Sequence, residues 1–68
     1  MIKPLWCVYY EYIKYVEGAT FYNEIHVPAF DIGEALQNGT RAIVALDFTK
    51  SAILRIEKTA MRVALEAE

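Results

Sequence analysis

Few residues in this chain could do chemistry: it has one histidine, His26, one cysteine, Cys7, and one serine, Ser51. Nucleophilic catalysis needs a serine or cysteine within hydrogen-bond reach of a base, and these three residues fall in separate segments. Glu24 and His26, two positions apart, offer two metal ligands, whereas a catalytic zinc centre takes three from the protein. We therefore predict a protein that is not an enzyme and has no metal site and no cofactor.

Each of these residues also has a plain structural interpretation. Cys7 lies inside an apolar segment, which is typical of a small buried thiol. His26 is interpreted as a half-exposed histidine of a hairpin. Glu11 and Glu24 could approach each other across that hairpin, as the paired carboxylates of acid–base sites do, but a chain of 68 residues is short for an enclosed pocket, so a solvated acidic patch is the better interpretation.

The segment that must position these groups is rich in tyrosine: four of the seven residues from 9 to 15 are tyrosines. Successive side chains of a strand point to opposite faces, and the run 5–16 is apolar at both sets of positions. A small antiparallel sheet normally leaves one face in water. We therefore expect a homodimer, or a stable complex with another protein, to cover the second face.

A hairpin is predicted between this run and a second alternating run, 21–27. Gly18 suits the first central position of a type II′ turn, which needs a positive φ. That turn pairs Val16 with Phe21, and it places Tyr12 opposite Ile25. A three-residue turn would exchange the faces of the first strand, because a slip of one residue turns every side chain over.

The predicted register defines two faces of the hairpin. The first consists of Val8, Tyr10, Tyr12, Val16, Phe21, Ile25 and Val27. The second consists of Cys7, Tyr9, Glu11, Ile13, Tyr15, Tyr22, Glu24 and His26. Pro28 should end the second strand because proline has no amide proton to donate to a ladder.

A helix is predicted over 31–46. Asp31 and Glu34 form a capping box, in which Asp31 accepts from an amide of the first turn and Glu34 reaches back to the cap amide. An apolar stripe follows at helical spacing: Ile32, Ala35, Leu36, Gly39, Ala42, Ile43 and Leu46. Gly39 within this stripe indicates a close approach to the sheet, with a kink at residues 38–39 as the alternative.

The last part of the chain supports two interpretations. Residues 52–58 can form a third strand with Leu54 and Ile56 pointing inward, and a third strand is favoured because two strands alone are marginal in water. The alternative is a helical tail over 51–68. The predicted fold is thus one α+β domain, 1–68, with three antiparallel strands and one helix in the order β-β-α-β. A short C-terminal helix from Ala60 is a further option.

Composition narrows the class of protein. A hydrophobic content of 56% with 13% aromatic residues excludes disorder, and no apolar run is long enough for a membrane span. The lone cysteine cannot form an internal disulfide, so we expect a cytoplasmic protein without a signal peptide. The net charge of −2 and the absence of a basic cluster disfavour nucleic-acid binding.

Several positions resemble small phage-encoded inhibitors of host proteins, over residues 5–63. They are Trp6 opening the first strand, Val27-Pro28 closing the second, Glu34-Ala35-Leu36 in the first helical turn, and Leu54-Arg55-Ile56 in the third strand. The chain resembles most the inhibitor of host RNA polymerase made by T-odd podophages, and some anti-CRISPR proteins have a similar layout. In that inhibitor two arginines of the third strand contact the polymerase; the matching positions here are Arg55 and Glu57.

The resemblance implies a non-enzymatic inhibitor that binds a host protein machine, such as RNA polymerase or a defence complex, in the host cytoplasm. Self-association in a structural role and binding of single-stranded nucleic acid are the alternatives. Tyrosine and arginine are enriched at protein interfaces, which favours the sheet face opposite the helix as the binding site. The predicted site residues are Tyr9, Glu11, Tyr15, Tyr22, Glu24, His26, Arg55 and Glu57.

Overall fold

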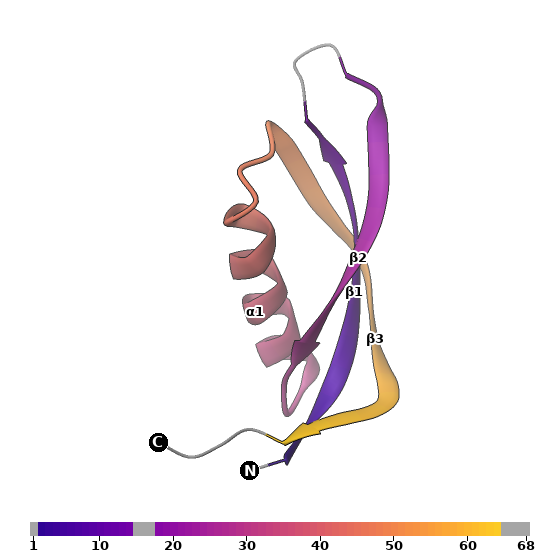
Figure 1. The fold of residues 1–68 in the computed structure, drawn as a ribbon, viewed down its shortest axis with the longest axis vertical. Helices are drawn as coiled ribbons and strands as arrows, with labels where there is room; N and C mark the ends of the chain where they lie inside the picture. The colour runs from indigo at the N-terminus through magenta and orange to yellow at the C-terminus, as the bar shows by residue number, and fades with distance from the viewer. Residues whose placement is uncertain (1, 15–17, 65–68) are drawn as a thin grey trace.

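The computed structural model of the chain describes residues 2–14 and 18–64. The elements follow in the order β1 (Ile2–Ile13), β2 (Thr20–Pro28), α1 (Ile32–Val44) and β3 (Lys50–Ala64). The strands form one antiparallel sheet, and α1 packs on one of its faces (Figure 1). The predicted α+β class and the β-β-α-β order are confirmed.

The tyrosine-rich strand is the centre of the sheet, whose strand order is β2-β1-β3. Val8 and Tyr10 are buried on the face that meets α1, and Cys7 is buried on the other face. A strand with a neighbour on each edge loses more of its surface to the protein than an edge strand does. The central position of β1 therefore accounts for part of the apolar pattern from which we predicted a partner.

The predicted type II′ turn is wrong. β1 and β2 pair Ile13 with Thr20 and Tyr12 with Phe21, so the connection is longer than two residues. Tyr15 and Val16, which the predicted register included, lie outside the described residues.

The two predicted faces of the hairpin nevertheless survive the change of register. The partner of Tyr12 moves from the predicted residue 25 to residue 21, a shift of four positions. Because side chains alternate with a period of two, an even shift keeps each side chain on its face, whereas an odd shift would exchange the faces.

The capping box at the start of α1 is present, with one difference from the prediction. Asp31 is the N-cap, and its Oδ1 accepts from the Glu34 amide at 2.8 Å. Glu34 Oε1 accepts from the Phe30 amide at 2.6 Å, one residue before the cap amide that we predicted. Its other oxygen, Oε2, lies 3.0 Å from the Lys3 ammonium, which ties α1 to the start of β1.

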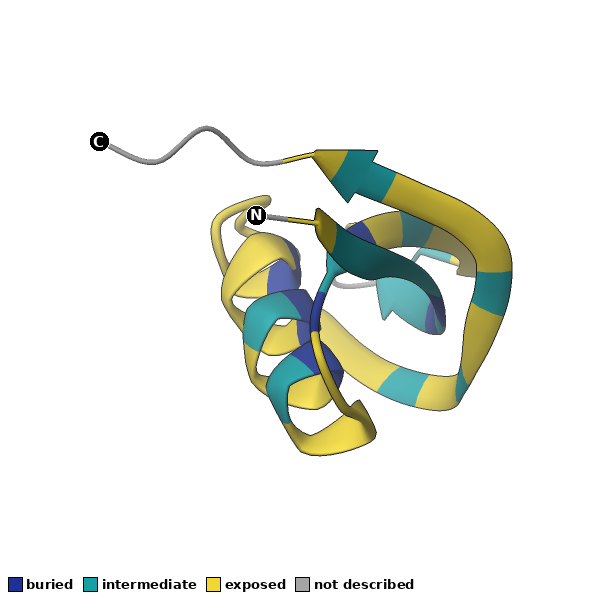
Figure 2. Cartoon of the chain, turned by 90° about the horizontal axis from the view of Figure 1, so that it is seen from below, coloured by how far each residue is buried: buried dark blue, intermediate teal, exposed yellow. Residues whose placement is uncertain are grey.

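The buried side of α1 is narrower than predicted. Only Ala35, Gly39 and Ile43 are buried, and the buried positions of α1 lie on its side toward the sheet (Figure 2). Ile32, Ala42 and Leu46 of the predicted stripe are exposed, as is Leu36; Leu46 lies beyond the helix end at Val44. The helix is continuous through Gly39, so the close approach to the sheet is confirmed and the kink is not formed.

The third strand is longer than the predicted 52–58 and contains a bulge. Tyr9 pairs with Arg55, but Tyr10 pairs with Ile53, so Leu54 is an extra residue on β3. The bulge lets Ile53 and Ile56 both pack against the core, while Leu54 is exposed. The inward position predicted for Ile56 is confirmed, and that predicted for Leu54 is wrong.

The C-terminal part of the described chain is a strand. β3 continues to Ala64, so both the helical tail and a helix starting at Ala60 are wrong for the described residues; residues 65–68 lie outside them. A second irregularity separates Pro4 from Trp6 in the pairing with β3. At this point the Thr59 hydroxyl donates to the Leu5 carbonyl at 2.6 Å.

Two of the tyrosines are part of an aromatic cluster on the helix side of the sheet. The Tyr12 ring stacks on Phe48 at 4.1 Å and on Phe21 at 5.5 Å between centroids, and Tyr10 lies beside both Tyr12 and Phe48. Such pairs add about 0.5–1.5 kcal/mol each to the burial of their area. These tyrosines therefore stabilise the fold, which leaves those of the opposite face for other roles.

Candidate functional site

The sheet face that α1 does not cover, called here the open face, contains the predicted site. β1 presents Cys7, Tyr9 and Glu11 on it, and the cross-strand pairs bring their neighbours from β2 and β3 alongside. Tyr9 and Glu11 are half-buried, while the predicted residues of the two edge strands are exposed. They are Tyr22, Glu24, His26, Arg55 and Glu57. Tyr15, the remaining predicted residue, lies outside the described part of the chain.

An open hollow of about 590 Å³ lies at the middle of this face. The Tyr22 and Leu54 side chains at its lining are 69% and 53% exposed, which is high for residues of this size. The full lining consists of Tyr9, Tyr10, Tyr22, Asn23, Glu24, Leu54 and Arg55. Leu54 was missed as a site residue, because only the bulge turns it toward this face.

Arg55 is held in place by two neighbours. Its guanidinium carbon lies 4.3 Å from the centroid of the Tyr9 ring, and its Nε lies 3.0 Å from Glu57 Oε1. A cation–π contact at an exposed site contributes about 0.5–1 kcal/mol, and an exposed ion pair contributes less than about 1 kcal/mol. Together they fix the direction of the guanidinium more than they stabilise the fold.

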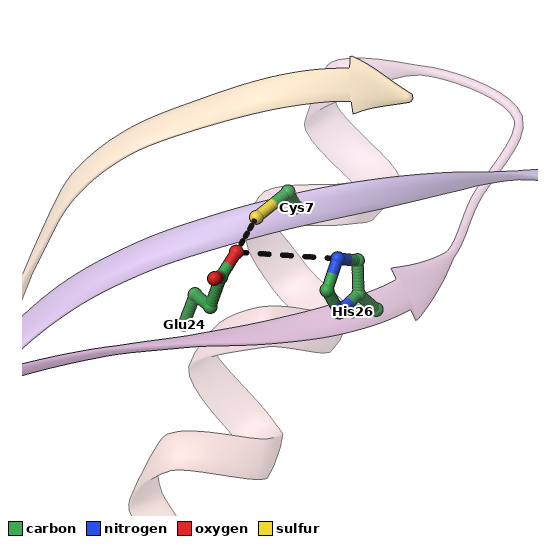
Figure 3. Close-up of side chains that lie close together, drawn as sticks. All are labelled: Cys7, Glu24 and His26. Carbon is green, nitrogen blue, oxygen red and sulfur yellow. Dashed lines mark hydrogen bonds and ion pairs between the residues drawn. The ribbon is translucent and has the colours of Figure 1, made fainter. Parts of the chain in front are cut away.

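At one end of the open face, β1 and β2 bring together three residues with different donor atoms. Cys7 Sγ donates to Glu24 Oε2 at 2.7 Å, and the same oxygen lies 4.0 Å from His26 Nε2 (Figure 3). All three donor atoms lie within 4.8 Å of one another. Among the described residues this cluster is the place where a metal ion could be held.

The sequence did not predict this cluster because the predicted register separates its members. With Tyr12 opposite residue 25, His26 would lie opposite Glu11. In the structure His26 is the direct partner of Cys7, and Glu24 is its diagonal neighbour. The interpretation of Cys7 as a buried thiol holds, but its sulfur is also in contact with a carboxylate.

Electrostatics keep the Cys7 sulfur protonated in the absence of a metal. Burial raises the pKa of the Cys7 thiol, and the hydrogen bond to Glu24 and the charge of Glu57 raise it further. The pKa of the neighbouring Tyr9 hydroxyl is also raised, first by its interaction with Cys7, while Arg55 acts in the opposite direction. A neutral, buried thiol is a poor nucleophile, so the closeness of Cys7 to His26 does not amount to an activated dyad.

The charges on the open face are mainly acidic. Glu11, Glu24 and Glu57 lie on it with two basic residues, Arg55, which is already paired with Glu57, and Lys50, the cross-strand partner of Ile13. Binding of a phosphate backbone requires several Lys or Arg side chains along one surface. Two basic side chains, of which Arg55 is ion-paired, fall short of that requirement.

Within the described ranges, α1 falls short of the length and apolarity that a membrane-crossing helix requires. No protein-family model matches this chain, and no curated protein or solved structure is similar enough to match it.

Proposed function

We propose that this chain is a non-enzymatic protein-interaction module that binds another protein through its open face. The observation that supports the proposal most is the hollow between Tyr22 and Leu54, two large and exposed side chains that flank the Tyr9–Arg55 stack. Aromatic and arginine side chains at the centre of a concave surface are the usual anchors of protein interfaces.

The surrounding charges define the kind of partner. Glu11, Glu24 and Glu57 give the open face a border with more acidic than basic residues, since only Arg55 and Lys50 oppose them among the described residues of this face. A partner that places an apolar side chain in the hollow, with lysine or arginine around it, would match both features. Charges at a border of this kind mainly set orientation and association rate, and the central anchors supply most of the affinity.

A non-enzymatic role is supported by the positions of the described nucleophiles. Ser51 pairs with Tyr12 near one end of β1, whereas His26 pairs with Cys7 nearer the other end. A serine–histidine arrangement would need these side chains within hydrogen-bond distance. Cys7 is close to His26 but is neutral and donates to Glu24.

The resemblance to small phage inhibitors extends the proposal to the partner's class. An inhibitor of this layout binds a larger host machine, such as RNA polymerase or a defence complex, and blocks it without chemistry. Arg55 is the matching contact residue in this chain, and Glu57, its ion-pair partner, takes the place of the second arginine.

Self-association is a second candidate, favoured by a separate surface. The outer side of α1 and its flanks expose large apolar residues: Phe30, Ile32, Leu36, Val44 and Leu46. Contiguous apolar surface is rare on proteins that work as monomers. A second copy of the chain could cover this surface while the open face stays free.

Affinity capture from a bacterial lysate tests the proposal with two matched variants. Leu54→Ala removes an exposed leucine of the open face, and Leu36→Ala removes one of similar exposure, 53% against 48%, on α1. We expect Leu54→Ala to lose the captured partner and Leu36→Ala to retain it.

The other outcomes are equally informative. Loss of the partner with Leu36→Ala alone would move the binding surface to α1. Recovery of nothing but the chain itself, with a dimer in light scattering, would favour self-association, and capture of single-stranded nucleic acid would contradict the proposal.

A further inference from the structure

Three metal-binding side chains of different chemistry converge on the open face, although they are not adjacent in sequence. Cys7 comes from the central strand, and Glu24 and His26 come from consecutive outward positions of β2 (Figure 3). The pairing of β1 with β2 holds the three side chains close together, because His26 is the direct partner of Cys7 and Glu24 is its diagonal neighbour on the same face.

The observed distances are close to those that a zinc ion requires. Tetrahedral ligands at Zn–S, Zn–N and Zn–O bond lengths of about 2.0–2.3 Å lie about 3.3–3.7 Å from one another. The structure has 2.7 Å between Cys7 Sγ and Glu24 Oε2 and 4.0 Å between that oxygen and His26 Nε2. The first separation is too short and the second too long by less than 1 Å, and the third, from Cys7 Sγ to the His26 nitrogen, is at most 4.8 Å. Zinc geometry therefore requires rotation of the exposed Glu24 and His26 side chains toward the sulfur.

We propose that Cys7, Glu24 and His26 bind one Zn²⁺ ion, with the fourth coordination position open to solvent on the open face. Thiolate, imidazole and carboxylate are the three ligand types that zinc takes in proteins, and three protein ligands with one free position make an open site. The assignment does not depend on the identity of a protein partner.

The surroundings of the cluster favour a cation. Glu57 lies on β3 directly opposite Cys7, so a second carboxylate, ion-paired with Arg55, lies on the same face beside the cluster. On binding, the zinc ion takes the place of the thiol proton, which leaves to solvent, and the Sγ–Glu24 hydrogen bond is replaced by two metal bonds. Burial of Cys7, which is 3% exposed, would shield a zinc–sulfur bond from water.

The fourth coordination position of the proposed zinc ion would be free to bind a further ligand. Glu24 and His26 are roughly half exposed, so the ion would be reached from the solvent side of the sheet. A water molecule, or a donor atom from a bound protein, could complete the coordination there. Glu24 also lines the central hollow, so the ion would lie at the border of the surface that we propose for partner binding.

Cobalt titration of the full chain tests this assignment, because Co²⁺ replaces Zn²⁺ and reports its ligands by colour. The reduced protein, freed of metal by a chelator, is titrated with Co²⁺ and then with Zn²⁺. We expect one equivalent of Co²⁺ to give a thiolate-to-metal charge-transfer band and the strong visible bands of a tetrahedral site, and Zn²⁺ to abolish both.

Four variants locate the ligands. Cys7→Ser should abolish the charge-transfer band, and Glu24→Gln and His26→Gln should each weaken cobalt binding at least about tenfold. Glu11→Gln, a change of the same kind on the same face but outside the cluster, should bind as the parent does. Because Cys7 is buried, circular dichroism is used to check each variant's fold; the half-exposed Glu24 and His26 keep the test decisive if Cys7→Ser does not fold.

The assignment would be overturned by a cobalt spectrum of an octahedral, oxygen-bound ion. Unchanged affinity in both Glu24→Gln and His26→Gln would overturn it as well. The cobalt titration uses the chain alone, so its result does not depend on whether the chain captures a protein partner. A failure of the zinc assignment can therefore be distinguished from a failure of the proposed function.

Discussion

A Cβ atom added at Gly39 of α1 would lie 3.1 Å from Val8 Cγ2 and 3.2 Å from Val8 Cγ1 of β1. Both separations are shorter than ordinary van der Waals contact, and Val8 is completely buried. The side chain of a β-branched residue has little freedom to move away. The helix therefore rests on the sheet at this point because position 39 has no side chain.

Gly39→Ala should consequently destabilise the protein although alanine is the better helix former. The gain in helix propensity, about 1 kcal/mol, is opposed by overpacking that costs about 1–3 kcal/mol. We expect a net loss in the free energy of unfolding, measured by urea denaturation. In the Val8→Ala background the same change should become stabilising, and a destabilisation of equal size in both backgrounds would contradict the proposed contact.

From the bulge on β3 we predict different effects for substitutions at two adjacent residues, Ile53 and Leu54. Ile53 packs against the core and Leu54 does not, so Ile53→Ala should lower the free energy of unfolding by about 1–3 kcal/mol and Leu54→Ala by less than about 0.5 kcal/mol. Urea denaturation of the two variants measures the difference. The reverse order would mean that the strand lacks the bulge.

Acidification should weaken the attachment of α1 to β1. The hydrogen bond from the Phe30 amide, and then the Lys3 ammonium, hold the pKa of Glu34 below its ordinary value of 4.5. A carboxyl whose pKa is lowered by folding contributes stability above the unfolded pKa and loses it as the pH falls through the folded pKa. The melting temperature should therefore fall as the pH drops below about 4.5.

Glu34→Gln is the matched variant for that prediction. The variant should melt at a lower temperature than the parent at pH 7. The difference between the two melting temperatures should become smaller as the pH falls below the ordinary carboxyl range, because the Glu34 carboxylate of the parent then becomes protonated and loses its charge. A gap that is constant across the pH series would show that Glu34 acts through its shape alone.

Some parts of this structure follow from short-range signals in the sequence. Asp31 and Glu34 mark the start of α1 because a capping box involves only neighbouring residues, and Pro28 ends β2 because it has no amide proton. The described residues that were predicted for the open face lie on it for the same reason: alternation along a strand is a local property, and it survived an error of four positions in the register.

The other parts depend on pairings between distant residues. The position of Leu54 is set by a bulge whose partner residues, Tyr9 and Tyr10, lie far away in the sequence. The pairing of Cys7 with His26 likewise depends on the hairpin register, and Gly18 suggested a different one. No local pattern distinguishes these registers, so the cluster of Cys7, Glu24 and His26 could not be predicted from the sequence.

The Tyr9–Arg55 stack supplies the last prediction, which concerns binding without a change of fold. Arg55 is exposed and its contacts are weak, so Arg55→Ala should leave the melting temperature nearly unchanged. If Arg55 is an anchor of the interface, the same change should weaken partner binding by about 2 kcal/mol or more, roughly thirtyfold. Arg55→Lys should recover only part of the affinity, because an ammonium does not stack on the Tyr9 ring as a planar guanidinium does.

Titration calorimetry with the captured partner measures all three proteins, and Arg62→Ala on the same strand is the control. Arg62 is exposed but lies opposite Pro4, away from the hollow, so its removal should leave the affinity unchanged. Equal losses from Arg55→Ala and Arg62→Ala would mean that the arginines act only through net charge. In that case the open face would attract its partner by long-range electrostatics, and Tyr22 and Leu54 would have to supply the anchors alone.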